Sequence, residues 1–159
     1  MTLFRSPTFA ITAAFLLAAG SQLRGQGFPT ITTRQFTGGS VKIQVTGAFS
    51  IAEEVPINTK ASYADGEATW LQFGASGSEK PNATITYGDN KEIGITVARG
   101  KLMATGGIMP GEKSVCSGKA DVTATSVSGT YTCRGVPSHD PATSKQGKVD
   151  ITVTFTAKS

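Results

Sequence analysis

The stretch that decides the fold runs from Cys116 to Cys133 and reads CSGKADVTATSVSGTYTC. If it forms a hairpin closing near Ala124-Thr125, the two cysteines lie directly opposite each other, because loop length fixes which residues pair. Ala-Thr is poor turn chemistry, so a wider loop would also serve. On the cysteine face the further pairs are Gly118 with Tyr131, Ala120 with Gly129 and Val122 with Val127. On the opposite face they are Ser117 with Thr132, Lys119 with Thr130 and Asp121 with Ser128. Apolar and polar pairs separate cleanly, which predicts a disulfide between neighbouring strands.

The alternative for the two cysteines is a metal site. Zinc prefers four protein or solvent ligands, and a blue-copper centre needs two histidines, a cysteine and usually a methionine. The chain has two cysteines and a single histidine. We therefore expect no metal and no cofactor, and a structural disulfide that stabilises the fold by roughly 3 kcal/mol.

Alternation of apolar and polar residues dominates the chain on both sides of this hairpin. Residues 147–157, for example, place Val149, Ile151, Val153 and Phe155 on one face and threonines on the other. Strands with one apolar face belong to antiparallel sheets packed on one another. The expected fold is all-β, an antiparallel β-sandwich of about nine strands with one disulfide, after an N-terminal signal helix. The expected strands are 41–51, 58–64, 67–73, 82–87, 92–98, 101–105, 114–123, 127–136 and 147–157.

Turn signals predict the register of the other hairpins. A two-residue turn at Asp65-Gly66 pairs Ala61 with Trp70 on the more apolar face, so Trp70 is expected to point inward. The alternative is an exposed Trp70 that serves as a stacking platform for carbohydrate or protein. Two further hairpins are predicted in this way: Arg99-Gly100 sets Val97 opposite Leu102, and a three-residue loop Gly88-Asp89-Asn90 sets Ile85 opposite Ile93.

The first twenty residues have the features of a secretory signal peptide. Arg5 supplies the positive charge, a short apolar run follows, and small residues precede a cleavage point after Gly20, with an alternative after Gly27. The apolar run is shorter than the roughly 20 residues that span a bilayer. We expect a signal peptide at 1–20, an extended or disordered segment at 21–40, and a β-sandwich domain at 41–159. The mature protein is then secreted or periplasmic, without stable membrane insertion.

The charge distribution bears on the class of partner. The whole chain carries a formal charge of +4, spread along its length without a basic run. Nucleic-acid binding needs Lys and Arg clustered on one face or helix. No nucleic-acid partner is expected.

Catalytic groups are sparse in this sequence. The single histidine is His139, and its neighbours Ser138 and Asp140 cannot adopt triad geometry with it because the three are consecutive. We expect no catalytic residue. The alternative is an unrecognised hydrolase that uses His139 with Asp140 and a distant hydroxyl. The long loop predicted at 137–146 is the candidate binding loop, with Ser138, His139, Asp140 and Lys145 as its candidate residues.

One segment resembles a known family. Val127-Ser-Gly-Thr-Tyr-Thr132, Gly135-Val136, Asp140-Pro141 and Lys148-Val-Asp-Ile-Thr-Val-Thr154 are similar to the C-terminal half of the mycobacterial lipoprotein-antigen family. The resemblance covers about thirty residues and implies an exported, envelope-associated protein that is not an enzyme. The chain lacks the lipid-bearing cysteine of that family at the signal junction, so lipid anchoring is not carried over. No functional residues are implied.

Together these features predict an exported, non-enzymatic β-sandwich that acts as a binding or interaction module of the cell envelope or exterior. Its partner is expected to be an envelope protein, a glycan or a small apolar ligand. The remaining alternative is a purely structural envelope component.

Overall fold

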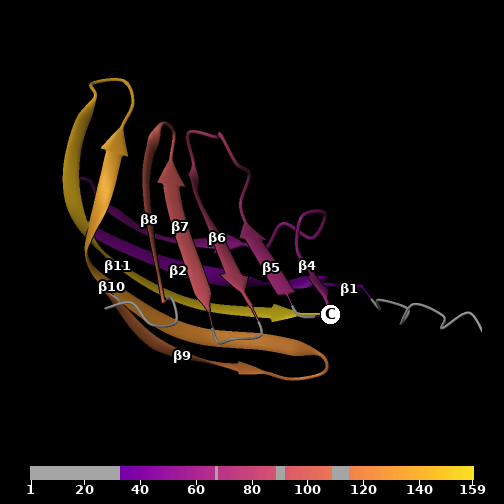
Figure 1. The fold of residues 1–159 in the computed structure, drawn as a ribbon. Coiled ribbons are helices and arrows are strands. Elements are labelled where there is room, and N and C mark those ends of the chain that lie inside the picture. The colour runs from indigo at the N-terminus through magenta and orange to yellow at the C-terminus, as the bar shows by residue number, and fades with distance from the viewer. Residues whose placement is uncertain (1–32, 67, 89–91, 109–114) are drawn as a thin grey trace, which may run out of the picture. The chain divides into compact units, whose positions relative to one another are not determined.

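The computed structural model describes residues 33–66, 68–88, 92–108 and 115–159, which belong to one compact unit, Ile31–Ser159. The signal peptide predicted at 1–20 and its alternative cleavage point after Gly27 lie outside the described residues. Figure 1 shows the described chain as a ribbon.

Every regular element in these residues is a β-strand, and neighbouring strands pair antiparallel. The strands are β1 (Arg34–Gln35), β2 (Gly38–Gly47), β3 (Ile51–Pro56), β4 (Tyr63–Asp65), β5 (Ala68–Phe73), β6 (Pro81–Tyr87), β7 (Ile93–Arg99), β8 (Leu102–Ile108), β9 (Cys116–Val122), β10 (Ser126–Asp140) and β11 (Lys145–Lys158). They form one sheet in the order β1-β4-β5-β6-β7-β8-β10-β11-β2-β3, with β9 on the side of β10. The prediction of an all-β antiparallel fold is confirmed.

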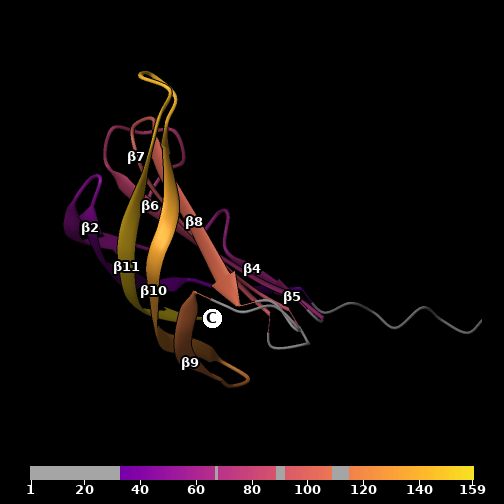
Figure 2. The same cartoon turned by 60° about the vertical axis from the view of Figure 1, so that its left-hand side comes forward.

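The two packed layers expected from the sequence are the two halves of this one curled sheet. We call β1 and β4–β8 the first layer, and β2, β3 and β9–β11 the second layer (Figures 1 and 2). The layers are continuous where β8 pairs with β10, at Ala104 opposite Ser138. They meet again at an isolated bridge between Ile57 and Phe73. Between these two places the sheet encloses the core.

The core is built from the inward side chains of both layers. The prediction for the last strand is confirmed, since the alternate residues of β11 from Val149 to Ala157 are all buried. The largest fully buried side chains are Phe36, Phe73, Phe155, Ile43, Leu71, Ile85, Ile93, Ile95 and Ile151. Burial of such side chains is worth about 1.5–3 kcal/mol each, which makes this shared layer the main source of stability.

The disulfide hairpin has the predicted register. All seven pairs from Cys116 opposite Cys133 to Val122 opposite Val127 are as expected, and the loop is the two-residue turn at Ala124 and Thr125. The cysteines form a disulfide, with Cα atoms 3.9 Å apart. Two residues of the apolar face depart from expectation: Gly118 is exposed, and the Val122 side chain is 59% exposed.

The expectation that Trp70 points inward is wrong. Tyr63 pairs with Trp70, and the loop begins at Gly66, which has a φ of +51°. The buried face of β5 carries Leu71 and Phe73, while Trp70 is 41% exposed. Ser62 can be buried on the inner side because its hydroxyl bonds both the N–H and the C=O of Gln72.

Two other hairpins differ from prediction by two residues in register. Val97 lies opposite Ala104 rather than Leu102, and Ile85 lies opposite Ile95 rather than Ile93. A shift of two residues keeps every side chain on its predicted face, because side chains alternate with period two. The inward faces of β6 and β7 were therefore assigned correctly.

Two element boundaries are corrected. The strand expected at 41–51 is a hairpin, because β2 ends at Gly47, whose φ is +119°. A Cβ there would lie 2.5 Å from the backbone oxygen of Lys148, so the close approach requires glycine. The domain also begins before 41, since Phe36 is fully buried.

Candidate functional site

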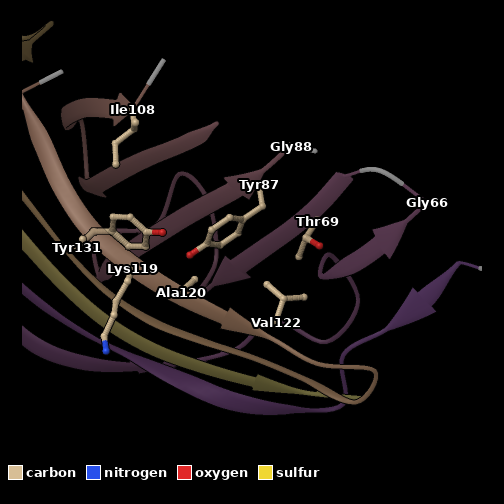
Figure 3. A pocket seen from close by; sticks show the side chains of 10 residues that line it. Gly66, Thr69, Tyr87, Gly88, Ile108, Lys119, Ala120, Val122 and Tyr131 are labelled. Atoms are coloured by element: carbon tan, nitrogen blue, oxygen red, sulfur yellow. The ribbon is translucent and has the colours of Figure 1, made fainter. Parts of the chain in front are cut away.

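The candidate site is a cleft where the two layers diverge. One edge of β10 is shared by β8, at Ser138 and His139, and by β9, from Val127 to Cys133. Beyond the point where β8 leaves this edge, the first layer and β9 separate and enclose a cleft of about 580 Å³ (Figure 3). It is lined by Gly66, Thr69, Tyr87, Gly88, Ile108, Gly118, Lys119, Ala120, Val122 and Tyr131.

Two tyrosines from opposite layers face each other in the cleft. The rings of Tyr87 and Tyr131 have centroids 6.2 Å apart at an interplanar angle of 61°. Both rings rest on Phe155, at 6.1 Å for Tyr87 and 6.4 Å for Tyr131. Tyr87 meets the other two rings tilted or edge-on, and Tyr131 stacks on Phe155 at an interplanar angle of 14°. These are favourable arrangements of aromatic rings, so the three form a rigid apolar floor.

The Tyr87 hydroxyl is buried and has no hydrogen-bond partner among the described residues. Burial raises the pKa of this phenol far above its ordinary value, and the nearby Tyr131 hydroxyl raises the pKa further without reaching hydrogen-bond geometry. Tyr87 therefore stays neutral at all ordinary pH values.

The wall opposite Tyr87 is formed by Tyr131 of β10 and by strand β9, which pairs with β10. Ala120 and Val122 are small or apolar, and Gly118 makes room for the Tyr131 ring, since a Cβ there would lie 2.5 Å from a ring atom. Lys119 is the single charged residue among the lining residues. Figure 3 shows its ammonium turned away from both tyrosines. Apart from Lys119, the described residues that line the cleft are uncharged.

The turn that ends this wall is held by Arg34. The Nη1 group of Arg34 in β1 donates a hydrogen bond of 2.9 Å to the backbone oxygen of Thr123 and another to that of Ala124. The guanidinium lies 4.8 Å from the ring centre of Phe36, which fixes its orientation. One side chain therefore ties the first layer to the tip of the β9–β10 hairpin.

The residues predicted from the sequence lie at the other end of β10. The segment 137–146 is not a long loop, since β10 continues to Asp140 and β11 starts at Lys145, with a turn between them. Ser138, His139, Asp140 and Lys145 all line one hollow of about 310 Å³ there. The structure thus brings the four residues together, in a smaller space than the cleft.

The side chains of Ser138 and His139 do not point toward a common position in this hollow. Successive strand residues point to opposite faces, so Ser138 is buried and His139 is exposed. The Asp140 carboxylate accepts hydrogen bonds from the Thr143 hydroxyl at 2.7 Å and the Ala142 N–H at 2.9 Å. These bonds lower the pKa of Asp140, and they make it part of the turn.

The cleft residues were not identified from the sequence. Val122, Ala120 and Gly118 were placed on the apolar face of the disulfide hairpin, which is the signal that the sequence contains. Small side chains on such a face leave space if nothing large lies opposite. Whether anything large lies opposite β9 depends on the path of β8, which the pattern of apolar and polar residues does not predict.

Within the described residues, no group of three or more His, Cys, Asp and Glu side chains is arranged to hold a metal ion. Nor does any helix in this part of the chain have the length and apolarity that crossing a membrane requires. No protein-family model, no curated protein and no solved structure matches the chain significantly.

Proposed function

We propose that the protein is a non-catalytic binding module, and that it holds a small, uncharged, apolar molecule in the cleft between Tyr87 and β9. The observation that carries the proposal is the cleft itself. Its volume of about 580 Å³ lies within the range of ligand sites, about 300–1,000 Å³, and such sites are mostly apolar. The described lining combines aromatic rings with small residues, and Lys119, its single charged side chain, points away from the tyrosines.

The construction of the cleft also supports binding. Its floor is a packed aromatic cluster, and its β9 wall is fixed at one end by the Cys116–Cys133 disulfide and at the other by Arg34. A site whose walls are already in place loses little conformational freedom on binding, which favours affinity.

The compartment forms part of the proposal. The disulfide is consistent with an oxidising environment, and such bonds persist in secreted and periplasmic proteins. We infer an exported protein of the cell envelope or exterior. The resemblance of residues 127–154 to envelope lipoprotein antigens agrees with this location.

The test uses the neutral fluorescent probe N-phenyl-1-naphthylamine with the full oxidised chain. Ala120→Phe places a ring in the cleft, while Asp121→Phe places the same ring on the outer face of the same strand. We expect saturable binding to the wild type and to Asp121→Phe, weakened roughly tenfold or more in Ala120→Phe, a loss of about 1.4 kcal/mol. Equal affinity in all three proteins would overturn the proposal, as would absence of binding to the wild type.

A further inference from the structure

Strand β9 is an open edge of the sheet. It pairs with β10 on one side, and no other strand in the described part of the chain pairs with it on the other side. Figures 1 and 2 show β9 at the margin of the second layer. An open edge presents backbone N–H and C=O groups that can pair with a strand of another molecule, so its side chains decide whether such pairing occurs.

The hydrogen bonds of the β9–β10 hairpin show which backbone groups of β9 point outward. The Thr123 N–H and the Val115 C=O, which flank β9, both bond to β10. In an antiparallel pair the residues bonded to the neighbouring strand alternate along the chain, and no register shift interrupts this pair. The odd-numbered residues of β9 therefore bond to β10, while Gly118, Ala120 and Val122 direct their N–H and C=O groups toward the open edge.

We propose that β9 pairs with β9 of a second copy of the protein, antiparallel and about a two-fold axis at Ala120. Gly118 of each copy then lies opposite Val122 of the other. These residues exchange backbone hydrogen bonds across the axis, because all of them direct their polar groups toward the open edge. A two-fold axis is the commonest symmetry of protein dimers. The sheet of one molecule thereby continues into the sheet of the other.

The charges on the outer face of β9 favour this register over its neighbours. With the axis at Ala120, the exposed Lys119 of each copy lies opposite the exposed Asp121 of the other, which gives two ion pairs. An axis at Lys119 would set two lysines opposite each other, and an axis at Asp121 would set two aspartates opposite each other. Opposite charges stabilise a pair of strands, whereas like charges directly opposite destabilise it. Both ion pairs also occur at positions without backbone hydrogen bonds, where side chains lie closer together.

The exposed Val122 side chain is covered by this pairing. It is 59% exposed in the single chain, and in the dimer it faces Gly118 of the other copy. Gly118 lies against Tyr131, since a Cβ there would come within 2.5 Å of a ring atom. The valine methyl groups therefore meet a bare backbone beside an aromatic ring. Burial of this apolar surface favours association.

The open edge of β3 differs from that of β9, because its residues oppose pairing. Strand β3 carries the adjacent Glu53 and Glu54 and ends at Pro56, which has no N–H. Charges and proline on an edge strand prevent its pairing with other molecules. Lys119 of β9 would act in the same way if it were alone, but Asp121 of the second copy neutralises it. The sequence of β9 thus opposes pairing with most strands and permits pairing with itself.

Analytical ultracentrifugation of the full oxidised chain tests the proposal. We expect a reversible dimer with a dissociation constant between micromolar and millimolar, because an interface of two short strands is small. Lys119→Asp and Asp121→Lys should each weaken the dimer roughly tenfold or more, since each sets like charges opposite each other in both pairs. Lys42→Asp makes the same change in charge as Lys119→Asp on β2, which is paired on both sides, and should leave the dimer unchanged.

Two combinations of these variants distinguish the proposed register from other modes of association. The double variant Lys119→Asp/Asp121→Lys exchanges the two charges and should regain the dimer. An equimolar mixture of the two single variants should also form a dimer, because each pair then joins an aspartate to a lysine. A wild-type chain that stays monomeric at millimolar concentration would overturn the proposal, as would a dimer that neither single variant weakens. Probe binding in the cleft is a separate measurement, so either proposal can fail without the other.

Discussion

Tyr87 of β6 and Tyr131 of β10 come from opposite layers of the sheet, and their rings meet edge-on with centroids 6.2 Å apart. The contact joins the layers at the point where they begin to diverge, so it forms the inner limit of the cleft. It also leaves the Tyr87 hydroxyl buried without a partner among the described residues. A stabilising contact between rings and an unsatisfied polar atom therefore occur in the same side chain.

Tyr87→Phe should keep the ring contact and remove the unsatisfied oxygen. Because a buried group without a hydrogen bond costs free energy, we expect the free energy of unfolding to rise by up to about 1 kcal/mol. Tyr63→Phe, on the exposed outer face, is the control and should change stability by less than about 0.5 kcal/mol. Urea denaturation measures both, and a clear loss of stability in Tyr87→Phe would contradict the assignment.

The same residue predicts how stability depends on pH. The folded pKa of Tyr87 is raised above the ordinary tyrosine value of 10.0, mainly by burial. The unfolded chain therefore loses this proton first, and the stability is fully present below pH 10 and falls as the pH rises above it. Tyr87→Phe should lose less stability than the wild type in this alkaline range. Parallel pH profiles for the two proteins would be inconsistent with a buried phenol.

Alternation and loop length predict strand pairing correctly where the turn of a hairpin fixes its register. The pairing of Cys116 with Cys133 and the buried residues of β11 follow from alternation and loop length alone. For β5 alternation left two faces to choose from, and the more apolar one was chosen. The structure buries the other, because Ser62 satisfies its hydroxyl on the backbone of Gln72.

The candidate site depends on how strands distant in sequence are arranged, and alternation and loop length do not predict that arrangement. The cleft exists because β8 and β9 divide one edge of β10, and no pattern in either strand encodes that division. The prediction of a loop at 137–146 is wrong for a local reason. Prolines and serines suggested a loop, but Gly135 forms a bulge, with its N–H bonded to Asp150, and β10 continues past it.

Gly106 lies at the place where β8 parts from β10, and we expect Gly106→Ala to destabilise the fold. A Cβ would lie 3.0 Å from the Cys116 Sγ and 3.2 Å from the Cys133 Sγ. Crowding of this kind in a packed core costs about 1–3 kcal/mol. Gly38→Ala is the matched control, since a Cβ there meets nothing within 4 Å. Similar melting temperatures for the two variants would show that the sulfurs can move aside.

Removing the disulfide should weaken the fold and the cleft together. Cys116 and Cys133 are separated by 17 residues, and closing a loop of this size stabilises a protein by roughly 3 kcal/mol. The double variant with serine at both positions should unfold at lower urea concentration and should bind the neutral probe less tightly, because β9 loses its fixed end. Mass spectrometry after alkylation of the unreduced wild type provides the check, and labelled thiols would contradict the bond.

Arg34 holds the other end of β9, and its removal should loosen the hairpin tip without unfolding the core. Hydrogen bonds from a charged donor contribute about 1.5–3 kcal/mol, and Arg34→Ala loses those to Thr123 and Ala124. Hydrogen exchange should therefore accelerate roughly tenfold or more at the Thr123 and Ser126 amides, while β11 amides keep their protection. Arg99→Ala, at an exposed position on β7, is the matched control. If both variants exchange like the wild type, the guanidinium does not hold the turn. If the turn loosens and the probe also dissociates faster, the width of the cleft depends on this one side chain.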